Sequence, residues 1–240
     1  MKKIVNPNAF KIFYTGEPTD PKIEGYDLSL GFDYLENENY MRLPLYYLYF
    51  DDKLNIAYKR ESSCNPSKKH FACFLVSNGK FKTRNNIFHK LSLYKEVASG
   101  GKYLNNLGRV VPQNETNQFL SECKFVIAYE NNFTQPGYIT EKVFQAYYAG
   151  ALPIYASEPR AANDINKKAV VYRGNFNSDE EMIEYIKELD NNDQKYCEKW
   201  NEPILADAKM NYSTIKEKLT KQIISNSKFQ HLFLNQAQRH

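Results

Sequence analysis

A single stretch, Phe125–Tyr155, constrains the fold of this chain more than any other part of the sequence. It begins with Phe125–Tyr129, a short apolar run of β-branched and aromatic residues that suits a buried strand and is too short for a helix. Glu130–Gly137 then supplies Asn, Pro and Gly, which end a strand and turn the chain. Apolar residues at helical spacing follow, and Leu152–Tyr155 reads as a second buried strand. The stretch therefore predicts a β-loop-α-β unit, from which parallel sheets are built.

The predicted helix of this unit has a cation in its first turn. Thr140 is a good N-cap, across which Ile139 can pack on Phe144, and Gly150 stands where a helix ends. Lys142 then faces the positive end of the helix dipole, which costs ~0.3–1 kcal/mol in an empty site. Because a helix N-terminus offers free N–H donors to phosphate, this placement favours a docked anion.

The neighbouring residue, Glu141, suits a sugar hydroxyl, because a carboxylate only accepts hydrogen bonds and a hydroxyl can donate one. The alternative is a solvated pair of Glu141 and Lys142 in an exposed first turn, since such pairs are common and contribute little. The spacing alone leaves both interpretations open.

The stretch contains three motifs: Tyr129-Glu130-Asn131, Tyr138-Ile139-Thr140-Glu141-Lys142 and Ala149-Gly150-Ala151-Leu152-Pro153-Ile154. Together they resemble the α1,3/4-fucosyltransferases, glycosyltransferase family ten, and most closely the bacterial branch. The resemblance extends from Phe10 to about Leu189. It implies a GDP-fucose donor held by residues of the first two motifs, which are Glu130, Asn131, Tyr138, Thr140, Glu141 and Lys142.

The N-terminal region offers a candidate catalytic base. Lys11–Tyr14 is strand-like, and a tight turn with Gly and Pro places Glu17 at the carboxyl end of that strand, where α/β proteins build their sites. From the residues alone Glu17 is an exposed turn acid. By resemblance the segment carries the family's base, and Tyr26–Phe32, with a strand over its first residues, and the extended segment Met41–Tyr47 match the family in the same order.

Phe71–Ser77 predicts another strand, which ends in a turn, and Arg84 begins a helical segment with one apolar face. The face is formed by Ile87, Phe88, Leu91 and Tyr94. A surface arginine is the alternative for Arg84, but the resemblance implies a contact with the donor diphosphate. The resemblance also implies that Ser77 and Asn78 lie near the nucleotide. It implies the same of Lys102, which belongs to the loop Ser99–Lys102.

The last third of the chain predicts a strand at Ala169–Tyr172 and a helix that Ser178 and Glu181 open as a capping box. Tyr212–Ser225 is a basic amphipathic pattern. Such a helix usually packs on a core and solvates its charges, and weak peripheral contact with an anionic membrane is the alternative.

Composition narrows the function classes. The net charge of +4 over 240 residues permits an anionic donor but is too small for a nucleic-acid-binding surface. The sequence holds no run of ~18 apolar residues and no signal peptide's apolar core, which predicts a cytoplasmic protein. Four widely spaced cysteines, with no C-x-x-C and no histidine at ligand spacing, argue against zinc and predict reduced thiols.

Together these observations predict an α/β protein with a Rossmann-type parallel-sheet donor domain. The resemblance implies a GT-B-like arrangement with a truncated N-terminal α/β acceptor domain, because only Met1–Phe10 precede the strand before Glu17. We expect a partial acceptor domain at residues 1–50, a linker at 51–69, the donor domain at 70–205 and a basic helical tail at 206–240.

The implied activity is inverting transfer of fucose from GDP-fucose to an N-acetyllactosamine-like glycan, with neither a metal nor a cofactor. The alternative is an inactive remnant that binds a nucleotide sugar or a glycan. A glycoside hydrolase is disfavoured, because no motif places a second acid beside Glu17.

Overall fold

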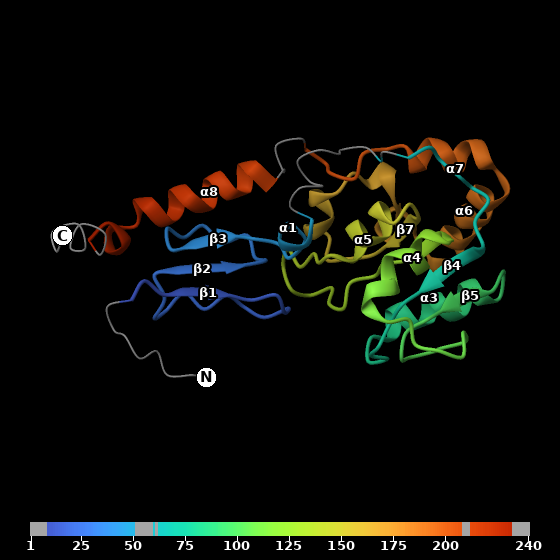
Figure 1. The fold of residues 1–240 in the computed structure, drawn as a ribbon, viewed down its shortest axis with the longest axis horizontal. Helices are drawn as coiled ribbons and strands as arrows, with labels where there is room; N and C mark the ends of the chain where they lie inside the picture. Colours follow the sequence, from blue (N-terminus) through green and yellow to red (C-terminus); the bar gives the residue numbers. More distant parts are fainter. Residues whose placement is uncertain (1–8, 51–59, 61, 208–211, 232–240) are drawn as a thin grey trace.

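The computed structural model describes residues 9–50, 60, 62–207 and 212–231, and it contains two parallel sheets (Figure 1). In the described residues the small sheet has the strand order β1-β2-β3 and the larger sheet has the order β5-β4-β6-β7-β8. The small sheet comprises β1 (Ile12–Tyr14), β2 (Leu28–Gly31) and β3 (Tyr40–Arg42). The larger sheet comprises β4 (His70–Phe74), β5 (Val97–Ser99), β6 (Cys123–Ile127), β7 (Leu152–Tyr155) and β8 (Val171–Tyr172). Both sheets confirm the predicted α/β class.

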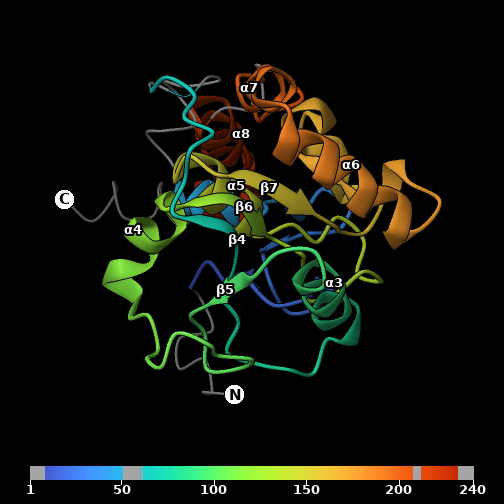
Figure 2. The same ribbon diagram turned by 90° about the vertical axis from the view of Figure 1, so that its right-hand side faces the viewer.

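Helices cover both faces of the larger sheet, as Figure 2 shows. Buried side chains of β6 alternate between the faces from Phe125 to Ile127: Phe125 and Ile127 join one core and Val126 joins the other. The first core includes α3 (Lys82–Ser92), α6 (Asp179–Asn191) and α7 (Asp193–Trp200). The second includes α4 (Thr116–Ser121) and α5 (Lys142–Tyr148). Burial on both faces explains why these strands are continuous apolar runs.

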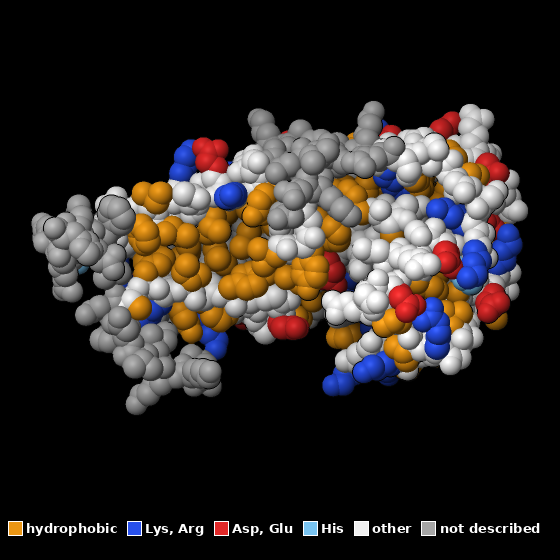
Figure 3. Space-filling model, in the orientation of Figure 1, with side chains coloured by type: hydrophobic (Ala, Val, Ile, Leu, Met, Phe, Trp, Pro, Cys, Tyr) orange, Lys and Arg blue, Asp and Glu red, His pale blue; other side chains and the backbone are white. Residues whose placement is uncertain are grey.

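The small sheet is covered differently. Its β2 residues Leu28 and Leu30 are buried in the core that α8 (Tyr212–Ser225) also joins through partly buried apolar side chains. On the edge strand β1, Ile12 and Tyr14 remain exposed. Figure 3 shows hydrophobic side chains gathered over this end of the molecule.

The basic helix α8 has the predicted bounds and is held against the small sheet. Asn226 and Lys228, just beyond it, bond Asp27 at 3.2 and 2.8 Å, through its carbonyl and its carboxylate. Its apolar side chains Ile215 and Leu219 pack on the protein core. The described residues therefore give no support to the membrane alternative, and no helix among them is long and apolar enough to cross a bilayer.

Two predicted local structures are wrong. The extended segment Met41–Tyr47 continues β3 only to Arg42, and its last residues begin the short helix α1 (Tyr46–Tyr49). The helix α5 starts after Glu141 rather than after Thr140, whose hydroxyl bonds a carboxylate instead of capping the helix. Gly150, at φ +86°, does stand just beyond the helix end as predicted.

The prediction of reduced thiols is also wrong, because all four cysteines form disulfides. Cys73 and Cys123 lie on the neighbouring strands β4 and β6, and Cys64 pairs with Cys197 on α7. Residues 51–59 and 61 of the predicted linker lie outside the described residues. Arg60 stacks on the rings of Tyr147 and Trp200, so this part of the linker packs on the larger sheet's helices.

Candidate active site

The predicted donor residues gather at the carboxyl ends of β4 and β6. A pocket of about 110 Å³ lies there and is lined by Arg84, Glu141 and Lys142 together with apolar residues of the two strands. The residues come from three separate sequence segments, which parallel pairing of β4 with β6 brings to one edge. Carboxyl ends of parallel strands are where α/β sheets bind ligands.

A buried carboxylate organises the first turn of α5. The Glu130 side chain accepts from the backbone N–H of Thr140 at 2.8 Å and from its hydroxyl at 2.7 Å. Lys142 donates to the Thr140 hydroxyl at 2.8 Å, and its Nζ lies 3.4 Å from Glu130. Burial raises the pKa of Glu130, and the charge of Lys142 opposes that rise. These contacts hold the ammonium group of Lys142, which lines the pocket.

Arg84 extends the cationic side of the pocket. Its guanidinium donates to the Asn78 carbonyl at 2.8 Å and to the Asn131 side chain. Burial lowers the pKa of Arg84, while the charge of Glu130 opposes that shift. Its Nε is buried and has no hydrogen-bond partner in the described part of the protein. A buried cation with a spare donor suits an anionic ligand.

Two further donor candidates, Ser77 and Lys102, do not line the pocket. Ser77 is exposed beside Asn78, and Lys102 is exposed in the loop after β5. This loop packs closely on the end of β4, because a Cβ on Gly101 would lie 2.0 Å from the Val76 carbonyl oxygen. The glycine thus lets the Lys102 loop approach the strand end.

Glu17 belongs to the small sheet. It lies in the turn after β1, where its backbone N–H donates to the Thr15 hydroxyl at 3.1 Å, and its side chain is exposed. Burial raises the pKa of Tyr138, and the carboxylates of Glu130 and Glu17 raise it further. The segment that follows Glu17 contacts the loop before Tyr138, because the Gln135 amide donates to Asp20 at 3.5 Å.

Sequence reasoning missed the residues that join the two sheets. Arg42 at the end of β3 forms an ion pair with Asp164 at 2.9 Å, and it donates to the Gly137 carbonyl at 3.0 Å. Glu158 accepts from the Gly137 N–H at 2.9 Å. No motif marks these residues, and 122 positions separate the ion-paired partners. The strand-end position of Arg42 is the one signal that could have drawn notice.

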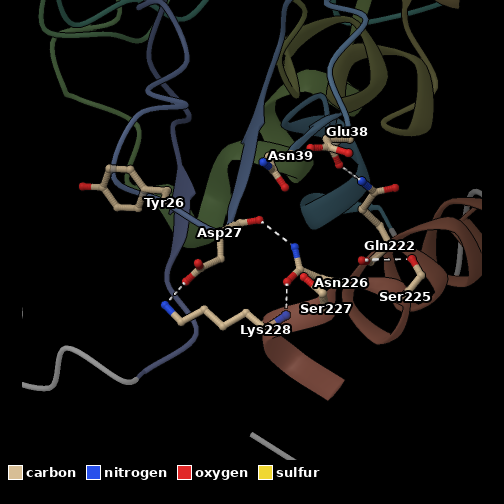
Figure 4. Close-up of a pocket in the computed structure, with 9 residues that line it drawn as sticks. All are labelled: Tyr26, Asp27, Glu38, Asn39, Gln222, Ser225, Asn226, Ser227 and Lys228. Atoms are coloured by element: carbon tan, nitrogen blue, oxygen red, sulfur yellow. Dashed lines mark hydrogen bonds and ion pairs between the residues drawn. The ribbon is translucent and has the colours of Figure 1, made fainter. Parts of the chain in front are cut away.

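A second, larger pocket of about 600 Å³ lies between the amino end of β2 and the end of α8. Figure 4 shows that its polar side chains bond one another, as Lys228 does with Asp27. None of the predicted site residues lines it. Among the described residues, no group of three or more His, Cys, Asp or Glu side chains could hold a metal ion.

The fold defines a GT-B-like α/β protein with two parallel sheets, which are joined through Arg42, Asp164 and Gly137. This chain belongs to glycosyltransferase family 10: residues 65–231 match the description "Glycosyltransferase family 10 (fucosyltransferase) C-term". Residues 2–49 match the description "Alpha-(1,3)-fucosyltransferase FucT N-terminal domain".

Similar proteins agree with this assignment. The alpha-(1,3)-fucosyltransferase FucT of Helicobacter pylori is 34% identical over 225 residues, which cover 80% of this chain and 46% of that protein. The 4-galactosyl-N-acetylglucosaminide 3-alpha-L-fucosyltransferase 9 of Mus musculus is 29% identical over 57% of this chain and 38% of its own length. The chain thus spans less than half the length of these curated relatives.

Solved structures show the same fold. A crystal structure of an α1,3-fucosyltransferase superposes with a TM-score of 0.77 at 28% identity, covering 92% of this chain and 74% of that one. A structure of an α1,3-fucosyltransferase with GDP-fucose superposes with a TM-score of 0.75, covering 92% and 77%.

Proposed function

We propose that this protein transfers fucose from GDP-fucose to a hydroxyl of an N-acetyllactosamine-like glycan. The observation that carries the proposal is the pocket lined by both Arg84 and Lys142. The small sheet, which bears Glu17, contacts the segment before Lys142, because Arg42 donates to the Gly137 carbonyl at 3.0 Å. Residues 1–50 then serve the acceptor and residues 70–205 the donor. The mouse relative is named for a 4-galactosyl-N-acetylglucosaminide, which supports this class of acceptor.

The proposed reaction is a direct displacement. The acceptor oxygen forms a bond to the anomeric carbon of fucose while its proton passes to the Glu17 carboxylate. The bond from that carbon to the diphosphate oxygen breaks, and its electron pair leaves with GDP. Attack opposite the leaving group inverts the anomeric centre.

The donor side stabilises the departing charge. Lys142, the first-turn amides of α5 and Arg84 are fixed donors for the phosphates, and fixed donors need no reorganisation as charge develops. Such cations can neutralise a leaving diphosphate without a metal ion, so we propose a metal-independent reaction with no cofactor besides the donor substrate.

We assign the remaining donor contacts by position. Glu141 lines the pocket and suits a sugar hydroxyl. Asn78 and Asn131 are both bonded to Arg84. We propose donor contacts for these two residues and, by resemblance, for Ser77, Lys102 and Tyr138. Glu130 is only 1% exposed and Thr140 equally so. We therefore propose that these two act by holding Lys142 rather than by contacting the donor.

A second candidate is a protein that binds the nucleotide sugar or a glycan without turnover. The exposed Glu17 side chain favours it, because no hydrogen bond from a described residue holds the carboxylate in place. The cytoplasmic location stays a prediction, and the two disulfides weigh against it, because disulfides persist in oxidising compartments.

A product assay tests the proposal. The protein is incubated with GDP-fucose and N-acetyllactosamine, then with a broad acceptor panel, and fucosylated product is sought by mass spectrometry. GDP is titrated in parallel by calorimetry. Product formation supports the transferase, and GDP binding without product supports the second candidate. A folded sample that neither binds GDP nor forms product rejects both.

A further inference from the structure

We propose that Arg42 is a positioning residue that sets the spacing between the base on the small sheet and the donor-binding segment before α5. This inference rests on the proposed function. Arg42 does not line the pocket. It acts through the backbone at Gly137, which joins the loop after β6 to the motif that starts at Tyr138.

The guanidinium uses its donors to bind three partners at once. Its Nε donates to the Phe32 carbonyl at 2.8 Å, within the small sheet's own segment. One terminal nitrogen bonds both Asp164 oxygens at 3.2 and 2.9 Å, and the other donates to the Gly137 carbonyl at 3.0 Å. A planar fork is suited to such a junction, and a lysine could not satisfy all three partners.

The larger sheet's side of this junction is built around Asp164. Its side chain is 5% exposed and also accepts from the Tyr46 hydroxyl at 3.2 Å. Burial raises the pKa of Asp164, and the positive charge of Arg42 opposes that rise. A buried carboxylate needs such a partner, since an unpaired one is strongly destabilising.

Gly137 is held from both ends. Its N–H donates to Glu158 at 2.9 Å while its carbonyl accepts from Arg42. Its φ of +69° favours glycine, and a Cβ there would lie 2.1 Å from the Phe32 carbonyl oxygen. The next residue, Tyr138, packs its ring edge-on against Phe32 with centroids 4.8 Å apart. These contacts therefore fix the position of the small sheet relative to the larger one at this point.

The position of Glu17 depends on this junction through the small sheet. Arg42 ends β3, Phe32 follows β2, and the Glu17 turn follows β1, so all three lie at one edge of the sheet. The turn is tied to β2 by the Thr15 N–H, which donates to the Leu30 carbonyl at 3.3 Å. A shift at Arg42 thus moves the base relative to the donor, and misplacement by ~1 Å can cost ~10²-fold in rate.

Arg42→Lys and Asp164→Asn test this role, with Asp190→Asn as the matched control. Asp190 is a buried carboxylate with 6% exposure that pairs with Lys95 and Lys124, away from the junction between the sheets. We expect both junction variants to lower kcat by ~10²-fold with unchanged GDP affinity. The control should keep kcat whatever its melting temperature does. Equal losses of kcat and GDP affinity in the junction variants would overturn the inference.

A double-mutant cycle separates positioning from general destabilisation. If Arg42 acts by placing Glu17, then Arg42→Lys should lower kcat in the wild-type background and have no further effect in Glu17→Gln. The same fold loss in both backgrounds would contradict the inference.

If the wild-type protein transfers no fucose, the proposed function is wrong, and a distance measurement then tests the role of Arg42 separately. Spin labels at Glu24→Cys and Gln194→Cys, both exposed positions, report the distance between the two parts of the molecule. Arg42→Lys should broaden the distance distribution measured by pulsed electron resonance. An unchanged distribution would overturn the inference.

Discussion

The start of α5 and the turn after β1 lie at carboxyl ends of parallel strands, yet the structure holds their functional side chains differently. At α5 a 1%-exposed carboxylate, Glu130, anchors Thr140 through two hydrogen bonds, and Lys142 bonds Thr140 in turn. In the β1 turn only the backbone is tied down, while the Glu17 side chain is exposed.

The difference indicates two kinds of preorganisation. A leaving diphosphate needs charges fixed before it departs, because stabilisation is largest when the surrounding dipoles need not rearrange. A base instead has to receive a proton from an acceptor that arrives separately, and a base often forms its catalytic hydrogen bond only in the complex. We therefore expect substitutions on the donor side to weaken GDP binding. Substitutions on the acceptor side should instead lower the turnover rate.

The largest expected effect is on the acceptor side. Glu17→Gln keeps the shape of the side chain but cannot take a proton, so turnover should fall by at least ~10²-fold. GDP affinity should stay unchanged, because the proposed donor contacts belong to the larger sheet. Steady-state kinetics and GDP calorimetry measure both quantities, and Glu24→Gln, an exposed acid of the same region, is the control. Wild-type turnover in Glu17→Gln would remove Glu17 from the mechanism.

The donor side should give the reverse pattern. Lys142→Ala removes a charge-assisted contact to phosphate and should weaken GDP binding by ~1–3 kcal/mol. It also takes a cation away from buried Glu130, so the melting temperature should fall as well. Calorimetry with GDP tests this, with Lys187→Ala on α6 as a control whose ammonium pairs with Glu184. Normal GDP affinity in Lys142→Ala would instead support the alternative that Lys142 is a solvated residue in an exposed first turn.

Local patterns predicted much of the fold. The bounds of β7 and α8 match the predicted ranges, because apolar runs of fixed length and helical periodicity are written within short windows. The Ser178 side chain accepts from the Glu181 N–H at 3.1 Å as a capping box requires. The Glu181 carboxylate, however, accepts from the N–H of Asn177 rather than from that of Ser178.

What the sequence did not reveal depends on partners far along the chain. The Thr140 hydroxyl bonds Glu130 across the loop, so a residue type that usually caps a helix serves another purpose. The disulfide partner of Cys64 is 133 residues away, and pairing cannot be deduced from spacing. For the site, motifs located Arg84 and Lys142 in one pocket, but only the packing of two sheets reveals Arg42.

The smallest expected effect concerns the buried anchor itself. Burial raises the pKa of Glu130 above its ordinary value in an unfolded chain, and Lys142 opposes that rise. At pH values between the pKa of Glu130 in the unfolded chain and its pKa in the folded protein, the folded protein binds more protons than the unfolded one. The contribution of Glu130 to stability is therefore fully present below the unfolded pKa and is lost as pH rises through the folded pKa.

Glu130→Gln cannot titrate and keeps an acceptor for the Thr140 N–H. Relative to wild type, this variant should therefore gain stability between about pH 4 and about pH 7, as measured by urea unfolding at the two values. Glu158→Gln provides a comparison of opposite sign. Burial acts to raise the pKa of Glu158, but hydrogen bonds from Gly137 and Arg160 outweigh it and lower the pKa. The Glu158 contribution is thus present at high pH and lost as pH falls, so Glu158→Gln should lose relative stability over the same rise. If both variants shift in the same direction, Glu130 is not the strained carboxylate that the donor side is built upon.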